Sequence, residues 1–445
     1  MVVSLLVIYW MQPSTPIRHL DFWLPTACVT LTLITWATTL TNGSNNLKSN
    51  IPAGLVVTGV ILIIGLTRYL GSFCCLTPTR PPELTQIIIV GIFVALLCFL
   101  TVRFLNGRVG WINVLTILIL FLLIILKSEP LSRLASISLR SLTGQSIEIS
   151  SAFDLKWLGF SYVAFRLMHT LRDRLSGRLQ ELTLHEYIIY VIFFPAYTAG
   201  PIDRVQRFIQ DLRQPYKLST EITFIAGKRI LLGIFKKFVL ADSLALFALN
   251  GANANQVNST GWLWVLLYAY ALRIYFDFSG YTDIAIGLGG ILGIHLPENF
   301  ETPYLKQNLT LFWNSWHMSL AQWFRAYFFN PLTRAMRSQP RNIPMPLIIL
   351  IGQLSTFVLI GLWHGITWNF AIWGAWHGFG LFIHNRWSEL IRSKASILEG
   401  YPRFKRLLGF TSTLLTFQYV CLGWVWFALP LPLQSWQVIG KLFGI

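Results

Sequence analysis

The chain has 445 residues, of which 54% are hydrophobic and only 12% are charged, and its mean hydropathy is +0.57. Soluble domains carry about 25% charged residues, so this composition excludes a water-soluble protein. The net charge of +17 is not accompanied by a nucleic-acid motif and suits basic loops facing anionic lipid head groups. We therefore expect one membrane-embedded domain over 1–445, with the lipid bilayer as a partner and no nucleic acid.

Apolar runs long enough to cross a bilayer, which needs about 20 residues, recur along the chain. The run at 1–11 is shorter and is interpreted as an interfacial or half-spanning helix, and the glycine-rich run at 284–294 as a re-entrant or interfacial helix. Spanning helices are predicted at 22–40, 53–72, 86–105, 111–127, 185–200, 222–250, 261–279, 346–364, 367–386 and 406–429, with a weaker one at 154–171. The predicted fold class is all-α, a polytopic membrane bundle of about ten or eleven spanning helices.

Arginine and lysine residues gather in four segments between these runs. The segments are 172–178, 204–217, 325–341 (which ends at Arg341) and 386–406. Because cytoplasmic loops carry an excess of basic residues, these four segments are the candidate cytoplasmic loops.

The predicted helix at 261–279 ends in residues that are unusual at membrane depth. Arg273 and Asp277 stand four residues apart and therefore share a helix face. An ionisable residue inside a span indicates function, although a structural ion pair explains these two equally well. The hydroxyls and second carboxylate of 279–283, together with Gly280, predict a break in the helix that borders a cavity, since irregular backbone at membrane depth needs such a setting.

The segment 311–329 repeats large apolar residues at spacings of three and four, which predicts one apolar helical stripe. His317 lies in this stripe beside Trp313 and Trp316. A single histidine on an apolar face is usually a core residue. Two neighbouring indoles and Arg325 leave a functional role open as the alternative, because a polar group at lipid depth needs a reason.

The segment 359–387 contains two Trp-His-Gly sequences, centred on His364 and His377. On one continuous helix a separation of thirteen residues would place them on roughly opposite faces, so both could not face one site. His364 follows a long apolar run, and Gly365 beside it allows a substrate to approach closely. His364 is therefore the favoured reactive residue, whereas His377 lies among glycines typical of helix packing.

A neutral imidazole is the usual general base for a hydroxyl nucleophile near neutral pH. The sequence has no Gly-x-Ser-x-Gly elbow, no His-Glu-x-x-His pair and no phosphate-binding glycine loop, so these routes to hydrolysis, metal chemistry and nucleotide binding are not indicated. The five cysteines form no Cys-x-x-Cys pair and no cluster with histidine at metal spacing. No metal site is expected.

Several strings within 194–378 together resemble the membrane-bound O-acyltransferase superfamily, and in particular the bacterial branch that includes alginate O-acetylation and teichoic acid D-alanyl transfer proteins. The strings are FPAYTAGPIDR (194–204), GIFKKFVLADSLA (233–245), FDFSGYTDIAIGL (276–288), LPENFETPYL (296–305), WNSWHMSLAQWFR (313–325) and GLWHGITWNFAIWGAWHG (361–378). The match is in order and covers about 190–380; before residue 150 it rests on hydropathy alone.

The resemblance implies that His364, in Leu-Trp-His-Gly, is the catalytic residue and that His317, in Trp-His-x-Ser, is a second functional histidine. It also implies helices around a central tunnel in which an acyl thioester and an acceptor hydroxyl meet. Ala326 departs from the branch, which usually has aspartate there. Residues expected to line the tunnel or bind substrate are Asp277, Ser279, Tyr281, Asp283, Trp316, Arg325, Trp363 and Asn369.

The expected function is that of an inner-membrane O-acyltransferase that moves an acyl group, preferably acetyl, to hydroxyls of an exported or cell-envelope polysaccharide. The donor would be acetyl-coenzyme A or an acyl carrier protein, with no bound cofactor, and an extracytoplasmic hydrolase-like acyltransferase is a candidate partner. The alternatives are D-alanyl or other acyl transfer to a cell-wall polymer through a partner, a non-catalytic component that hands an acyl group to such a partner, and, from a different class, a membrane transporter.

Overall fold

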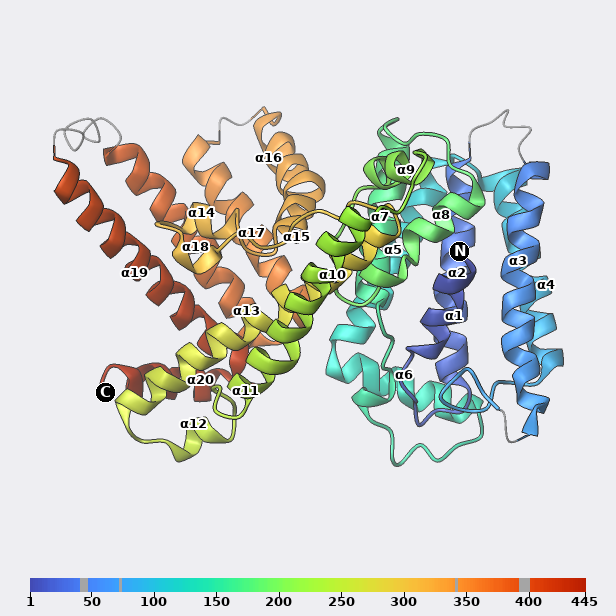
Figure 1. Ribbon diagram of the computed structural model, residues 1–445, viewed down its shortest axis with the longest axis horizontal. Helices are drawn as coiled ribbons and strands as arrows, with labels where there is room; N and C mark the ends of the chain where they lie inside the picture. Colours follow the sequence, from blue (N-terminus) through green and yellow to red (C-terminus); the bar gives the residue numbers. More distant parts are fainter. Residues whose placement is uncertain (41–46, 72–73, 341–342, 392–400) are drawn as a thin grey trace. The chain divides into compact units, whose positions relative to one another are not determined.

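A computed structural model describes residues 1–40, 47–71, 74–340, 343–391 and 401–445 (Figure 1). Throughout these residues the regular secondary structure is helical, and the one extended pairing is an isolated antiparallel bridge between Phe300 and Trp316. The all-α prediction is confirmed. The chain divides into two compact units, one of Met1–Ile222 with Leu288–Leu296 and the other of Thr223–Gly287 with Pro297–Ile445.

Six helices in the described part of the chain are long and apolar enough to cross a membrane, which confirms the prediction of a multi-pass membrane protein. They are Leu20–Thr39, Ser49–Tyr69, Leu84–Leu105, Val109–Lys127, Met345–His364 and Pro402–Ala428. This number is smaller than the ten or eleven expected. The long helices Thr260–Ile291 and Trp368–Ile391 are not among the six because their ionisable, aromatic and glycine residues make them less apolar.

The first unit contains nine α-helices among its described residues. They are α1 (Val2–Trp10), α2 (Leu20–Thr39), α3 (Leu47–Leu66), α4 (Leu84–Leu100), α5 (Val109–Lys127), α6 (Glu129–Leu142), α7 (Phe160–Leu175), α8 (Leu184–Val191) and α9 (Val205–Arg213). α2 packs against α7 and α8 and is 72% buried, whereas α4, beside α3, is only 11% buried (Figure 1). An apolar helix so exposed would be costly in water and indicates a face that contacts lipid.

The second unit holds the segments that carry the family motifs from 223 onward. Its main helices are α10 (Thr220–Ile234), α11 (Asp242–Ala245), α12 (Asn253–Gln256), α13 (Thr260–Ile291), α14 (Leu309–Trp313), α15 (Met318–Phe324), α16 (Asn330–Arg337), α17 (Met345–His364), α18 (Trp368–Ile391), α19 (Pro402–Ala428) and α20 (Pro432–Leu442). A π-helix, Phe235–Ala241, continues α10, and another, Arg325–Phe329, continues α15. α18 packs along α17 and also contacts α19 and α14.

The predicted break at 279–283 is wrong, because α13 is continuous from Thr260 to Ile291 and includes most of the supposed re-entrant run at 284–294. Gly280 has a different purpose. A Cβ on it would lie 2.7 Å from the carbonyl oxygen of Gly233, so these two glycines let α10 and α13 pack backbone against backbone.

The single stripe predicted over 311–329 is also interrupted. α14 ends at Trp313 and α15 begins at Met318, with a tight turn between them. Helical spacing alone does not reveal such a turn, because the residues on both sides keep the apolar pattern.

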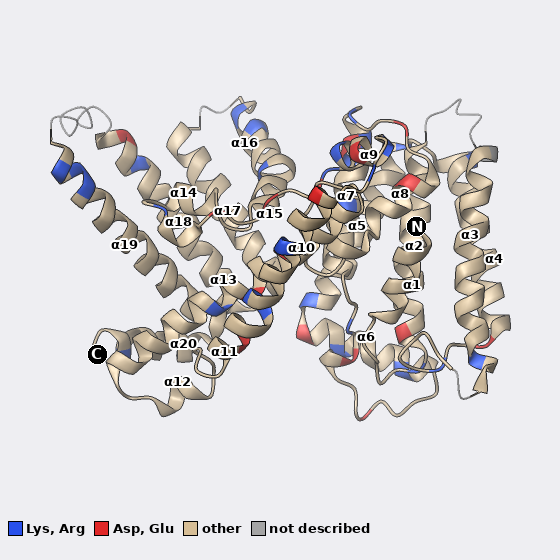
Figure 2. Cartoon of the chain, viewed as in Figure 1, with Lys and Arg blue, Asp and Glu red and all other residues tan. Residues whose placement is uncertain are grey.

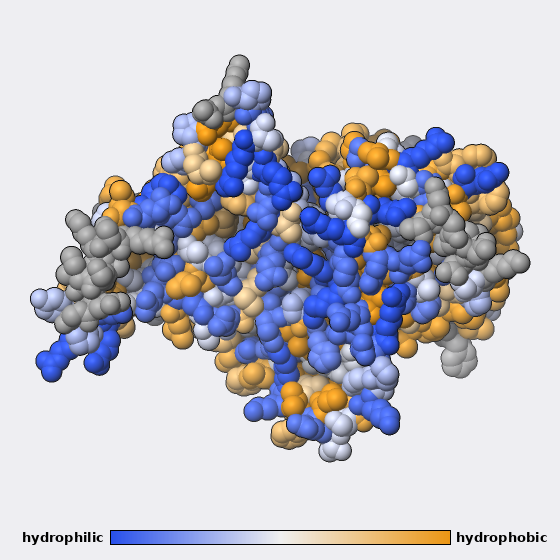
Figure 3. Space-filling model, turned by 90° about the horizontal axis from the view of Figure 1, so that it is seen from above, coloured by the Kyte–Doolittle hydropathy of each residue, from blue (hydrophilic) through white to orange (hydrophobic). Residues whose placement is uncertain are grey.

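Basic side chains gather toward helix ends, as Figure 2 shows for α16 and α19, while the middle parts of α3 and α4 carry none. Figure 3 shows a face of the molecule on which many hydrophilic residues are exposed. Of the predicted basic loops, Arg341 and residues 392–400 lie outside the described residues.

Candidate functional site

His364 is the last residue of α17, which ends where Gly365 takes an extended backbone (φ 179°, ψ 143°). Its half-buried imidazole is surrounded by aromatic rings from three helices. The ring centroids lie 4.6 Å from Trp363, 4.8 Å from Phe427 of α19 and 5.9 Å from Trp373 of α18. His364 is thus fixed in an apolar wall and still partly accessible, as a residue that meets a substrate must be.

His317 lies at the turn between α14 and α15, with a left-handed backbone (φ 42°, ψ 51°). A residue other than glycine adopts this conformation at a cost of about 1–2 kcal/mol. Buried Asn299 holds the turn: its carbonyl accepts the N–H of Met318 at 3.0 Å and its side-chain oxygen accepts the N–H of Ser319 at 3.1 Å. Strain that the surroundings maintain in this way is common at functional sites.

One indole connects the two histidines. The Trp363 ring lies 6.4 Å from the His317 ring and 4.6 Å from the His364 ring. His317 is only 4% exposed, packs edge-on against Phe278 at 4.5 Å, and neither of its ring nitrogens has a hydrogen-bond partner among the described residues. A buried polar group without a partner is costly, so the His317 imidazole keeps unused hydrogen-bonding capacity in this position.

His377 lies on α18 and His364 at the end of α17, in agreement with the separate helices predicted at 346–364 and 367–386. It is fully buried against Trp313 at 4.9 Å and Trp373 at 5.1 Å, and its ring nitrogens also have no hydrogen-bond partner in the described chain. Backbone of α19 at Gly423 closes over it. These contacts are those of a packed side chain, and the packing role of His377 stays a prediction.

Asp277 pairs across helices rather than along its own. Its carboxylate lies 2.5 Å from Nζ of Lys237 in the π-helix that follows α10, and not with Arg273 as one of the two sequence interpretations proposed. Half of the Asp277 side chain is exposed. The sequence suggested Arg273 as the partner because it shares a helix face with Asp277. In the folded chain Asp277 pairs instead with Lys237, which lies on another helix.

Asp283 is more deeply buried and has two cationic partners. Its two oxygens lie 3.0 Å from Nε of Arg229 and 2.6 Å from Nζ of Lys236, and Arg229 also bonds to Glu298. The charges therefore compensate one another within the second unit. No group of three or more His, Cys, Asp or Glu side chains in the described ranges is placed to hold a metal ion.

Lys236 and Lys237 are residues that the sequence reasoning missed. They lie within the apolar run predicted at 222–250, and charged residues inside such a run are themselves a signal of function or of a buried ion pair. The π-helix that carries them, Phe235–Ala241, is also a form that recurs at functional sites.

Two predicted residues brace the turn that holds His317. Trp316 is 5% exposed and packs 5.1 Å from Trp424 of α19. Arg325 donates from Nη2 to the side-chain oxygen of Asn314 at 2.9 Å, on the turn just before His317. The carboxylate that Ala326 replaces is thus not needed for this bond of Arg325.

The remaining predicted residues are more dispersed. Ser279 is buried in α13, and its hydroxyl has no hydrogen-bond partner among the residues described, while Tyr281 is partly exposed two residues later. Asn369 donates to the carbonyl of Leu429 at 2.5 Å and to the hydroxyl of Ser435 at 3.1 Å. Asn369 therefore ties α18 to the α19–α20 connection.

Comparison with known proteins adds to this geometry. The profile of the membrane-bound O-acyltransferase family matches residues 82–421. The chain is 35% identical over 254 residues to a teichoic acid D-alanyltransferase of Streptococcus thermophilus, which covers 55% of this chain and 59% of that protein. It is 33% identical over 292 residues to a probable alginate O-acetylase of Azotobacter vinelandii, covering 64% and 54%.

A third relative is a peptidoglycan O-acetyltransferase of Helicobacter pylori, 34% identical over 262 residues, covering 58% of this chain and 47% of that protein. The chain thus spans about half the length of these relatives. By name, the first transfers D-alanyl to teichoic acid, and the other two transfer acetyl to alginate and to peptidoglycan.

Proposed function

The chain belongs to the membrane-bound O-acyltransferase family, and we propose that it transfers an acyl group from a thioester donor to hydroxyls of an exported or cell-envelope polysaccharide. Acetyl is the acyl group we favour, since relatives named for O-acetylation occur beside the D-alanyltransferases. Acetyl-coenzyme A or an acylated carrier protein would be the co-substrate, and an extracytoplasmic hydrolase-like acyltransferase remains the candidate partner.

The observation that carries this proposal is the arrangement of His317, Trp363 and His364. In the proposed reaction the acceptor hydroxyl gives its proton to His364 while its oxygen attacks the thioester carbonyl. The carbon–sulfur bond breaks, the thiolate leaves, and the proton returns from His364 to the sulfur. His317, whose ring nitrogens are buried without a partner in the described chain, would orient the donor or the acceptor by a hydrogen bond.

The other predicted residues take supporting roles in this proposal. Trp316 and Arg325 would hold the His317 turn, and Trp363 would shape the space between the imidazoles. Asp277 and Asp283, with Ser279 and Tyr281 between them on α13, would contribute an ion-paired wall rather than free carboxylates. Asn369 would fix α18, and the tunnel through a single domain over 1–445 stays part of the proposal.

Two alternatives differ in what supports them. D-alanyl transfer through a partner protein is supported by relatives named as teichoic acid D-alanyltransferases. Transporters commonly place their substrate site at an interrupted helix, but α13 is continuous at Gly280, where the sequence predicted a break. Only the first alternative therefore keeps a specific observation in its favour.

The test uses cells that lack the gene and are supplied with the wild-type chain or with His364→Ala. Mass spectrometry of their envelope glycans measures ester-linked acyl groups, and immunoblotting of membranes confirms that both proteins are present. We expect acetate esters only with the wild-type chain. Esters that persist with His364→Ala would refute the assigned base, and D-alanine in place of acetate would support the alternative.

A further inference from the structure

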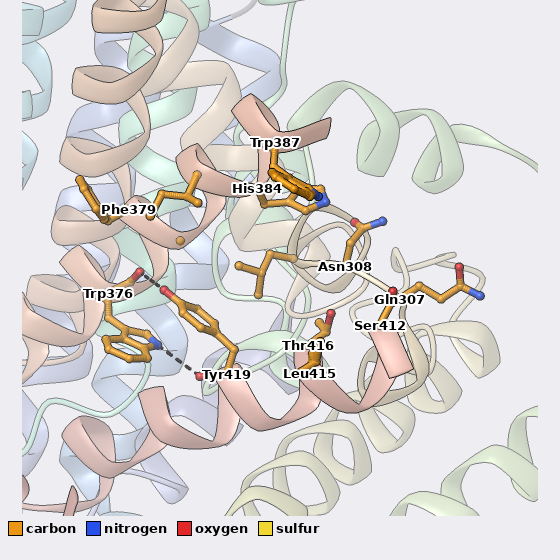
Figure 4. Close-up of a pocket in the computed structure, with 13 residues that line it drawn as sticks. Gln307, Asn308, Trp376, Phe379, His384, Trp387, Ser412, Leu415, Thr416 and Tyr419 are labelled. Carbon is orange, nitrogen blue, oxygen red and sulfur yellow. Dashed lines mark hydrogen bonds between the residues drawn. The ribbon is translucent and has the colours of Figure 1, made fainter. Parts of the chain in front are cut away.

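An apolar groove of about 520 Å³ lies on the second unit, between α18, α19 and the turn before α14 (Figure 4). Its walls are formed by Phe379 and Ile383 of α18 and by Leu415 of α19, with Asn308 and His384 toward one end. The α18 residues and the α19 residues each recur at spacings of three and four, so each helix presents one continuous face to the groove.

The floor of the groove is rigid. Tyr419 donates its hydroxyl to the carbonyl of Trp376 at 2.5 Å, and the Trp376 indole donates to the carbonyl of Tyr419 at 3.2 Å. The two rings stack at 4.7 Å. Gly380 leaves room for the Tyr419 hydroxyl, which would overlap a Cβ at that position. A floor fixed by two hydrogen bonds and a stack indicates a preformed groove, as binding sites usually are.

The walls face outward. Phe379 is 51% exposed, Ile383 53% and Leu415 71%. Leu415 belongs to α19, one of the six helices that are long and apolar enough to cross a membrane, and an apolar face exposed on such a helix suits contact with hydrocarbon. An occupant of this groove must therefore be apolar along most of its length.

One end of the groove is basic. Lys405 stands seven residues before Ser412, a lining residue, and therefore on the same face of α19, with Arg403 and Arg406 beside it. Arg386 lies near the C-terminal end of α18, paired with Glu389. His384 at this end bonds to the hydroxyls of Thr310 and Ser388. Around the groove's end the described cations thus outnumber the carboxylates.

We propose that this groove binds one anionic glycerophospholipid, with an acyl chain against Phe379, Ile383 and Leu415 and the phosphate head group at Lys405 and its basic neighbours. An apolar trough that ends at excess positive charge matches an anionic amphiphile better than a neutral lipid or an uncharged partner helix. This site is independent of the proposed acyl transfer.

The test uses the purified full chain in phosphatidylcholine vesicles that contain a small fraction of phosphatidylglycerol with a photoreactive diazirine on one acyl chain. After irradiation and proteolysis, mass spectrometry locates the lipid adducts. We expect adducts concentrated in 376–387 and 412–419, and a severalfold lower yield with a photoreactive phosphatidylcholine of the same chain.

Two variants locate the site. Leu415→Trp fills the groove and should lower these adducts severalfold, whereas Leu414→Trp, on a neighbouring exposed position outside the lining, should not. Lys405→Glu, a surface change that does not threaten folding, should remove the preference for phosphatidylglycerol. Adducts spread evenly over the exposed helices, equal yields from both lipids, or cross-linked dimers through this face would each overturn the proposal.

Discussion

His317 combines two properties that oppose stability, a left-handed backbone and a buried imidazole whose nitrogens lack hydrogen-bond partners in the described chain. Selection for stability alone would favour glycine or asparagine at this backbone position. In the reaction proposed above, this position would hold the imidazole beside Trp363. Substitutions at His317 can distinguish the effect of its backbone conformation from the effect of its imidazole.

His317→Gly and His317→Ala should both lose acyl transfer, because both remove the imidazole, but they should differ in stability. Glycine relieves the positive φ, so we expect the glycine variant to be more stable than the alanine variant by about 1 kcal/mol. Thermal unfolding in detergent, read by tryptophan fluorescence, measures the difference. Equal melting temperatures would show that the turn adjusts and stores no strain.

His364 and His377 should give opposite results when each is changed to glutamine. His364→Gln removes the proposed base and should lower turnover by about 10²- to 10⁴-fold with little loss of stability. His377→Gln disturbs a fully buried ring and should lower the melting temperature while the folded fraction keeps most of its turnover. Turnover per folded molecule distinguishes the catalytic role of His364 from the packing role of His377. A loss of turnover with His377→Gln as large as that with His364→Gln would contradict the packing role.

The sequence identified His364 and His317 through their apolar neighbours and their motifs, and it anticipated none of the side chains that bond to the two aspartates. Asp277 pairs with Lys237, and Asp283 pairs with Lys236 and Arg229, all on another helix. Spacing along one helix finds partners within that helix only. Partners across helices depend on how α10 crosses α13, which one sequence does not reveal.

At the scale of the helices, Gly280 lies among polar residues, and the sequence therefore suggests a break in the helix. In the structure Gly280 instead allows α13 to pack closely against α10. α13 stays continuous because Gly280 meets Gly233 of α10, and the intrahelical hydrogen bonds of α13 are kept. A break in the helix and a close contact between two helices would both favour glycine at this position. The two α10 glycines, Gly233 and Gly227, provide a direct test because only the first contacts α13.

Gly233→Ala should destabilise the protein by about 1–3 kcal/mol, because its Cβ would lie 2.5 Å from the carbonyl oxygen of Gly280. Gly227→Ala is the matched control. It has no atom within 4 Å of its Cβ position, so alanine there should be neutral or stabilising by up to about 1 kcal/mol through helix propensity. Melting temperatures of the two variants measure the contrast, which an equal effect at both sites would disprove.

The amphipathic helix α6, outside the six spanning helices, is tied to the following loop by Asp154. Burial alone would raise the pKa of this carboxyl, but hydrogen bonds from Ser136 and Arg140 and the charge of Arg140 hold the pKa below its ordinary value. A carboxyl with a lowered pKa stabilises the fold above its unfolded pKa of about 3.9 and loses that contribution as the pH falls through the folded value.

Melting temperatures between about pH 6 and about pH 3 should therefore fall more steeply for the wild-type chain than for Asp154→Asn. The variant itself should lose about 3–5 kcal/mol, because Arg140, only 3% exposed, keeps its charge without the carboxylate. Ser138→Ala, at an exposed position of the same helix, serves as the control. Parallel pH curves for the wild type and Asp154→Asn would mean that other carboxyls govern acid stability.

At the scale of the whole molecule, hydropathy predicted the membrane class and all six helices that the structure supports as spans. The apolar window predicted at 185–200 is divided into the short helices α8 and Phe194–Ala196. Hydropathy averages over a window and is insensitive to the backbone turns within it. The motifs around the histidines indicated the chemistry, while the turn at His317 required tertiary contacts with Asn299.

A remaining question for the whole chain is whether it would complete the proposed transfer alone or hand the acyl group to a partner. The histidine arrangement lies within one unit of this chain, so we expect the purified protein in vesicles to release thiol from acetyl-coenzyme A only when a soluble hydroxyl acceptor is present. Thiol release is measured by a colorimetric reagent, and ester formation by mass spectrometry of the acceptor. His364→Gln is the control and should release thiol about 10²- to 10⁴-fold more slowly. Donor binding without ester formation by the wild-type chain would show instead that an extracytoplasmic partner carries out the second half of the reaction.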